Sequence, residues 1–210
     1  MAQTTFYSDL GPSGNVYNCC SGWTMGGSGT LGSYYYDANE FTAGASGSVS
    51  QIDIGVGYVT GTNSFFASLW TVGSNGLPGT ELGQWNNLTS SQTFGGCCGL
   101  VSITGISGIS LTSGDNYFLV IGPTTGSSTT WEAWNWNNQG AVGTLLQASS
   151  GCTDGGGGAG CSWNSFGGQT LGAFDVLGSS GATVPEPSSL ALLGTGLVGV
   201  FGTIRRKLIR

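Results

Sequence analysis

Few residues in this 210-residue chain could catalyse a reaction, because it contains no histidine and holds all four Lys and Arg residues within its final six positions. Residues 1–204 therefore lack the basic side chains that activate a serine or cysteine nucleophile. A pair of carboxyl groups, as used in glycoside hydrolysis, is the catalytic arrangement that remains.

Glu132 is the best candidate acid, since its aromatic neighbours Trp131 and Trp134 would raise its pKa. No sequence spacing links it to its candidate partners, which are Asp115, Glu81 and Asp175. A solvated strand carboxylate is the simpler interpretation, and we predict that the protein is not an enzyme.

Tryptophan and asparagine gather in two segments that could bind sugar rings without any charge. In an extended strand, Trp134 and Trp136 lie on one face and Trp131 on the other, unless a bulge intervenes. Trp85 and Asn86 repeat this chemistry in a second segment. Aromatic faces pack on the apolar faces of sugars, and amides hydrogen-bond to hydroxyl groups. The alternative is that these tryptophans fill the core or cover its ends.

The six cysteines form three sequence pairs, which are Cys19 with Cys20, Cys97 with Cys98, and Cys152 with Cys161. The third pair encloses TDGGGGAG, a segment that glycine bends easily, so we predict a Cys152–Cys161 disulfide. The pairing of the other four stays open: each adjacent pair could close on itself, or the two pairs could cross-link each other. A zinc site is disfavoured, because the chain has neither histidine nor CxxC spacing.

No metal or cofactor is predicted, and nucleic acid is excluded as a partner. Residues 1–204 carry no Lys or Arg that could neutralise phosphate. Calcium is an alternative in a β-rich surface protein, but Asp154 lacks the DxDxD spacing of a persuasive calcium loop.

The elements that must position these residues are predicted to be strands. Only 7% of the residues are charged and 41 are glycine, which favours tight turns and glycine-rich loops. Short segments that alternate with a period of two, or are rich in apolar residues, are bounded by turn residues. These segments are residues 4–7, 34–41, 48–58, 64–72, 80–88, 100–109, 117–121, 129–135, 145–148 and 169–176. We predict an all-β fold, an antiparallel two-sheet sandwich with jelly-roll-like connectivity.

The C-terminal segment VPEPSSLALLGTGLVGVFGTIRRKLIR differs from everything before it. Residues 190–204 are uncharged and would span roughly 22 Å as a helix, somewhat short of a bilayer core of about 30 Å. The basic end should stay in the cytoplasm, which places the preceding domain outside. We therefore predict one short transmembrane helix, the alternative being a buried C-terminal core helix.

This segment resembles the PEP-CTERM sorting signal of exported bacterial proteins in the order and spacing of its parts. The matching residues are Val184, Pro185, Glu186 and Pro187, followed by the apolar run and then Arg205, Arg206, Lys207 and Arg210. The resemblance implies recognition and cleavage by a membrane-embedded exosortase. Proteins of this kind begin with a signal peptide, which residues 1–5 do not resemble, so we expect the sequence to begin near a mature N-terminus. A cytoplasmic protein is the competing interpretation.

The rest of the chain resembles, more loosely, the choice-of-anchor domains of other sorting-signal proteins. The landmarks are FYSDLG, EFTAG, FFASLWTVGSNGLPGTEL and LTSGDNYFLVIG. The resemblance implies a β-sandwich and no particular activity.

Together these patterns predict a β-sandwich ectodomain (residues 1–178), a linker with the Pro-Glu-Pro motif (179–189), a transmembrane helix (190–204) and a basic cytoplasmic tail (205–210). The expected precursor crosses the inner membrane once, and the mature protein reaches the cell surface or extracellular matrix. Its expected role is structural or adhesive in a polysaccharide-rich biofilm. The first alternative is a carbohydrate-binding module, and the second is a glycan-active hydrolase. Its ligand, its oligomeric state, and whether it is shed or anchored stay open.

Overall fold

Each segment of alternating or apolar residues contains strand residues, although the segments at 48–58 and 169–176 each span two strands. A computed structural model describes residues 3–152 and 157–180, which contain fifteen strands and one helical turn. The elements of the first half are β1 (Thr4–Ser8), β2 (Gly22–Gly26), α1 (Ser28–Leu31), β3 (Tyr36–Thr42), β4 (Gly47–Ile54), β5 (Val56–Thr60), β6 (Phe65–Val72) and β7 (Pro78–Leu88). Those of the second half are β8 (Gln92–Thr93), β9 (Val101–Thr104), β10 (Ser110–Leu111), β11 (Asn116–Pro123), β12 (Trp131–Asn135), β13 (Val142–Ala148), β14 (Trp163–Thr170) and β15 (Phe174–Ser180). The all-β prediction is confirmed.

The strands pair into three hydrogen-bonded sheets. The largest has the order β14-β13-β3-β11-β6-β7. A second has the order β1-β15-β4-β10, with β9 also paired to β4, and a third has the order β2-β12-β5-β8. The described pairings are antiparallel except for β5 with β8. Strands from distant parts of the chain alternate, since β3 lies between β13 and β11. The jelly-roll-like connectivity stays a prediction.

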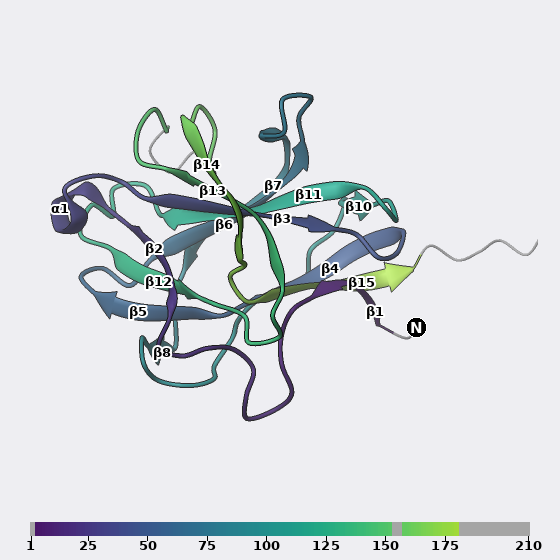
Figure 1. The fold of residues 1–210 in the computed structure, drawn as a ribbon, viewed down its shortest axis with the longest axis horizontal. Helices are drawn as coiled ribbons and strands as arrows, with labels where there is room; N and C mark the ends of the chain where they lie inside the picture. The colour runs from purple at the N-terminus through teal and green to yellow at the C-terminus, as the bar shows by residue number, and fades with distance from the viewer. Residues whose placement is uncertain (1–2, 153–156, 181–210) are drawn as a thin grey trace, which may run out of the picture. The chain divides into compact units, whose positions relative to one another are not determined.

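Gly55 joins the two smaller sheets into one layer. It separates β4 from β5, its N–H donates to the Ala173 carbonyl (2.9 Å), and its carbonyl accepts from the Asn135 N–H (2.8 Å). β4 therefore pairs with β15 before Gly55, and β5 pairs with β12 after it. The result is a two-layer structure with β3, β6, β11 and β13 above and β4, β5, β12 and β15 below (Figure 1).

The main core lies between these layers. Ile52, Ile54 and Val56 are fully buried, as their alternation predicts, and they belong to one apolar cluster with residues of the six-stranded sheet. Trp134 and Phe174 from the same layer join that cluster, with their ring centroids 5.7 Å apart. Burial of this continuous apolar surface is the main driving force for the fold.

A second apolar cluster covers the outer face of the six-stranded sheet, where Phe66, Trp70 and Phe118 are buried. Part of the glycine-rich loop lies over it, because the Gly157 carbonyl accepts hydrogen bonds from Trp70 Nε1 (3.0 Å) and from the Ser68 hydroxyl. Cys152 and Cys161 pack against the same cluster. Both faces of this sheet are therefore covered.

Several sequence predictions fall outside the described residues. These are the linker beyond residue 180, the sorting motif, the span at 190–204, the basic tail and Asp154. The strands described here belong to a compact unit that ends at Ser180. In the portion of the chain that the structure describes, α1 is far too short to span a membrane.

Candidate functional site

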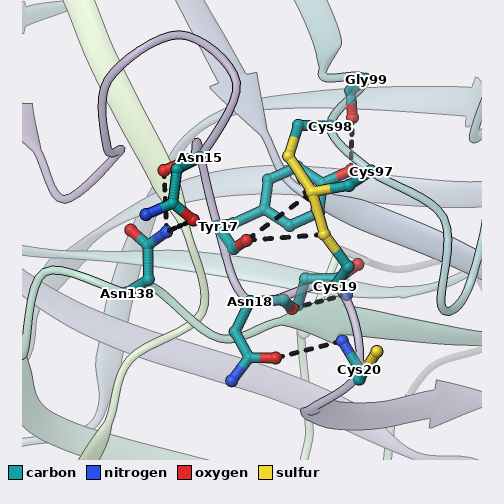
Figure 2. The surroundings of a disulfide bond; sticks show 10 residues. Asn15, Tyr17, Asn18, Cys19, Cys20, Cys97, Cys98, Gly99 and Asn138 are labelled. Carbon is teal, nitrogen blue, oxygen red and sulfur yellow. Dashed lines mark hydrogen bonds between the residues drawn. A yellow bond between two sulfur atoms is a disulfide. The ribbon is translucent and has the colours of Figure 1, made fainter.

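Three cysteine sulfurs meet where two loops come together. Cys19 lies between β1 and β2, and Cys97 and Cys98 lie between β8 and β9. The Cys97 sulfur is within bonding distance of both the Cys19 and the Cys98 sulfur. The two outer sulfurs are 3.8 Å apart, with Cys97 between them (Figure 2). The sequence left the pairing open, and the structure brings Cys19, Cys97 and Cys98 together without choosing between the possible pairs.

Hydrogen bonds hold the two loops together independently of any disulfide. The Tyr17 hydroxyl donates to the Gly99 carbonyl (2.9 Å), and the Gly95 N–H donates to the Cys19 carbonyl (2.8 Å). Cys20 is exposed and free, and its N–H donates to Asn18 Oδ1 (3.1 Å). Its sulfur points away from the other three (Figure 2). The structure therefore does not bring all four cysteines to one point.

The Cys152–Cys161 disulfide expected from the sequence is present. It links two cysteines that are half-buried against the outer apolar cluster. This position indicates that it holds the loop in place.

A shallow hollow of about 460 Å³ is lined by two tryptophans and a tyrosine, which are Trp23, Trp131 and Tyr35. Thr24 and Gln147 add polar groups, and Gly22 and Leu31 complete the lining. The Gln147 amide is held in position because it donates to Asp37 Oδ1 (2.9 Å). Among the described residues, the lining side chains carry no charge. The hollow has the aromatic and polar groups that suit a sugar ring.

The other predicted sugar-binding residues do not join this hollow. Trp134 is fully buried in the main core, where its Nε1 donates to the Ala173 carbonyl (3.1 Å), so its ring does not reach the surface. Trp136 packs against Trp23 with ring centroids 5.4 Å apart. Trp85 is half-buried against the main core, and Asn86 is exposed and accepts a hydrogen bond from Gln84 Nε2 (2.8 Å).

Sequence reasoning missed Trp23, which lies three residues after the first cysteine pair. Its ring packs against the core, and its Nε1 donates to the Thr170 carbonyl (2.8 Å). A solitary aromatic residue beside cysteines gives no local signal of a surface site. Only the pairing of β2 with β12 brings it near Trp131.

Glu132 is fully enclosed on the inward face of β12, the face that also carries Trp134. Neither carboxyl oxygen has a hydrogen-bond partner among the described residues. Burial raises the pKa of Glu132 to about 8, and the nearby Ser64 backbone opposes the shift in part. Glu81 and Asp115 are exposed and so do not share a site with it.

Asp175, the third candidate partner, lies opposite Asp53 across the pairing of β15 with β4. Burial, with the neighbouring Asp53 carboxylate as the next cause, raises the pKa of Asp175 to about 7. Burial also raises the pKa of Asp9 to about 7, although Asp9 accepts hydrogen bonds from the Phe174 N–H (2.8 Å) and the Tyr7 hydroxyl (3.1 Å). These carboxyl groups belong to the β1–β15–β4 region, and Glu132 lies elsewhere, on β12.

Comparison with known proteins identifies the C-terminal segment. Residues 183–207 match the model of the PEP-CTERM protein-sorting motif. No curated protein and no solved structure matches the chain significantly. The motif marks the chain as an exported, surface-directed protein that is processed by an exosortase. The choice-of-anchor resemblance of the remaining chain stays a prediction.

Proposed function

We propose that this protein is a non-enzymatic structural or adhesive component of the cell surface or extracellular matrix. The sorting motif supports this role, because it directs the folded domain to the outside of the cell. The fold supports it as well, since a disulfide-bonded two-layer β-structure has the properties of a durable extracellular module. Before processing, residues 190–204 hold the precursor in the inner membrane with residues 1–178 outside.

Processing is tested by replacing Pro185, Glu186 and Pro187 with alanine in the producing cells. Exosortase recognition needs this triplet, so the variant should accumulate as an unprocessed membrane precursor. Mass spectrometry of the C-terminus of both proteins is the measurement. A mature wild-type protein that still ends at Arg210 would refute cleavage at the signal.

A second proposed function is carbohydrate binding, and the observation that supports it is the aromatic hollow. Trp23 and Trp131 are the large aromatic residues of its lining together with Tyr35, while Gln147 and Thr24 offer hydrogen bonds to hydroxyl groups. The absence of cations from residues 1–204 favours a neutral polysaccharide over an anionic one. This site differs from the one expected from the sequence, since Trp131 is the sole residue of that set in the hollow's lining.

The binding proposal is tested with the double substitution Trp23→Ala and Trp131→Ala. Loss of both tryptophans from the lining should weaken retention on matrix polysaccharide from the producing cells by about tenfold or more. Phe166→Ala is the matched control, because Phe166 is an aromatic residue that is 51% exposed and outside the hollow. Circular dichroism confirms that each variant is folded. Equal retention of both variants and wild type would exclude the hollow as the binding site.

A further inference from the structure

Two carboxyl groups meet on the outer face of the layer that contains β4 and β15. Asp175 of β15 lies directly opposite Asp53 of β4, and the two side chains are in contact. Their face is the outer one, because the adjacent residues Ile54 and Phe174 point into the main core. Like charges that lie directly opposite each other destabilise a pair of strands. Residues 1–204 contain no Lys, Arg or His that could offset this repulsion.

The hydrogen bonds around these two carboxyl groups leave part of each without a partner. Asp53 is only 7% exposed, yet its Oδ1 atom has no hydrogen-bond partner among the described residues, and the same holds for Asp175 Oδ1. The other oxygen of Asp53 accepts a hydrogen bond from Gln51 Nε2 (2.7 Å), which fixes the orientation of the carboxyl group. The nearby Asp9 differs, since both of its oxygens accept hydrogen bonds. Asp53 and Asp175 are therefore the two residues of this region with free carboxyl oxygens.

We propose that Asp53 and Asp175 together bind one calcium ion, which bridges β4 and β15. Calcium prefers carboxylate oxygens, takes water as a further ligand and tolerates irregular geometry. Two carboxylates balance its double charge and end the repulsion between the strands. The next residues in the same row across the sheet are Ser8 on β1 and Ser102 on β9. Both are small and exposed, so the row leaves room for the water ligands of the ion.

The bound ion ties together strands from distant parts of the chain. β4 and β15 lie side by side (Figure 1), and β15 is the last strand before the described domain ends at Ser180. Calcium sites of extracellular modules are weak, with Kd values of about 10⁻⁴–10⁻³ M, whereas calcium-binding proteins of the cytosol are tuned to much lower concentrations. A site of this strength fills after export and stabilises the domain where it works.

The test compares melting temperatures of the full chain, followed by circular dichroism at pH 8 after metal has been removed with EDTA. One sample receives about 10 mM calcium chloride, roughly ten times the upper Kd, and the other receives sodium chloride of equal ionic strength. The sodium sample controls for general screening of the acidic domain. Calcium should raise the melting temperature by about 3–6 °C above the sodium sample. Calorimetric titration with calcium chloride should show one binding site per chain.

The double substitution Asp53→Asn and Asp175→Asn removes both charges and keeps the shape of both side chains. In sodium chloride this variant should melt no lower than wild type, because the repulsion between the carboxylates is gone. Its calcium shift should be lost, and these two results together separate loss of the ion from damage to the fold. Asp175→Asn alone, at a half-buried position, should also lose most of the shift and serves if the double variant does not fold. Asp115→Asn is the matched control, since Asp115 is an exposed acid in a turn, and it should keep the full shift.

Two results would overturn the proposal. The first is a wild-type melting temperature that calcium raises no more than sodium does, because the two carboxyl groups then share a proton instead of an ion. The second is a calcium shift that survives Asp175→Asn in full, because the ion then binds elsewhere on the chain.

Discussion

Replacing Glu132 by glutamine should reduce the loss of stability that the protein suffers as the pH rises. The ordinary pKa of this side chain is 4.5, and burial raises it to about 8 in the folded protein. The folded state therefore holds a proton that the unfolded state releases above pH 4.5. The stabilisation is fully present below the ordinary pKa and is lost as the pH rises toward about 8.

The size of the effect follows from the distance between pH 7 and the ordinary pKa. Holding the proton at pH 7 costs the folded state roughly 3 kcal/mol relative to the unfolded chain, at about 1.4 kcal/mol per pH unit. Glutamine does not titrate, so Glu132→Gln avoids this cost. At pH 4 the variant should be no more stable than wild type, because the buried amide brings two N–H donors where the protonated acid brings one O–H.

Urea unfolding of the disulfide-intact protein, followed by tryptophan fluorescence at pH 4 and pH 7, measures both free energies. The expected result is a gain in the variant's free energy of unfolding relative to wild type, by up to about 3 kcal/mol between the two pH values. Asp115→Asn is the control, since Asp115 is an exposed acid in a turn. If Glu132→Gln and wild type lose equal stability between pH 4 and pH 7, Glu132 is ionised in the folded state and its assigned burial cost is wrong.

Two further substitutions test packing and cross-linking. Gly172→Ala should destabilise the protein by about 1–3 kcal/mol, because a Cβ there would overlap the Trp134 ring. Gly168→Ala is the control and should change stability little, because its Cβ would meet open space. Thermal melts compare the two variants, and similar melting temperatures would contradict the packing of Gly172 against Trp134. Replacing both Cys152 and Cys161 by serine should cost about 2–3 kcal/mol, as expected for a short closed loop. Denaturant titration measures this loss, and an unchanged midpoint would show that the loop is held by its other contacts alone.

The alternation of apolar residues predicted the strands well where one face alone is buried. Val101 and Ile103 in β9 show this, since they are buried and alternate with the exposed Ser102 and Thr104. Ile52, Ile54 and Val56 are buried as their alternation predicts, although Asp53 and Gly55 between them are buried too. Gly55 was included in the same predicted strand, because a glycine inside an alternating run leaves the pattern intact. In the structure it marks the point where the strand passes from one sheet to the next.

The predicted strand at residues 169–176 shows where the pattern of apolar residues fails to reveal a break between two strands. It spans the end of β14 and the start of β15, which are separate strands in different sheets. Leu171, Gly172 and Ala173 between them are all buried, so the chain stays apolar where it changes direction. Gly172 lies directly against the Trp134 ring, a tertiary contact with no local sequence signature.

The functional residues were predictable only in part, because some of them come together only through strand pairing. The sorting motif is a linear signal, and it could be identified from residues 184–210 alone. The aromatic hollow depends on Trp23 and Trp131, which are far apart in sequence and meet through strand pairing. The sequence favoured a solvated strand carboxylate at Glu132, which is wrong because Glu132 is buried. Its inward position follows from the orientation of β12, which no local pattern indicates.

The cysteine cluster and the sorting motif, although they occupy separate parts of the chain, depend on the same compartment. Disulfides persist outside the cytoplasm, where the reducing thiol pools of the cell do not act. The motif at residues 183–207 independently sends the domain there. Export thus supplies the oxidising conditions under which these cysteines can form disulfides. Protein retained in the cytoplasm by removal of its export signals should contain Cys19, Cys97 and Cys98 as thiols, which maleimide alkylation and mass spectrometry would measure.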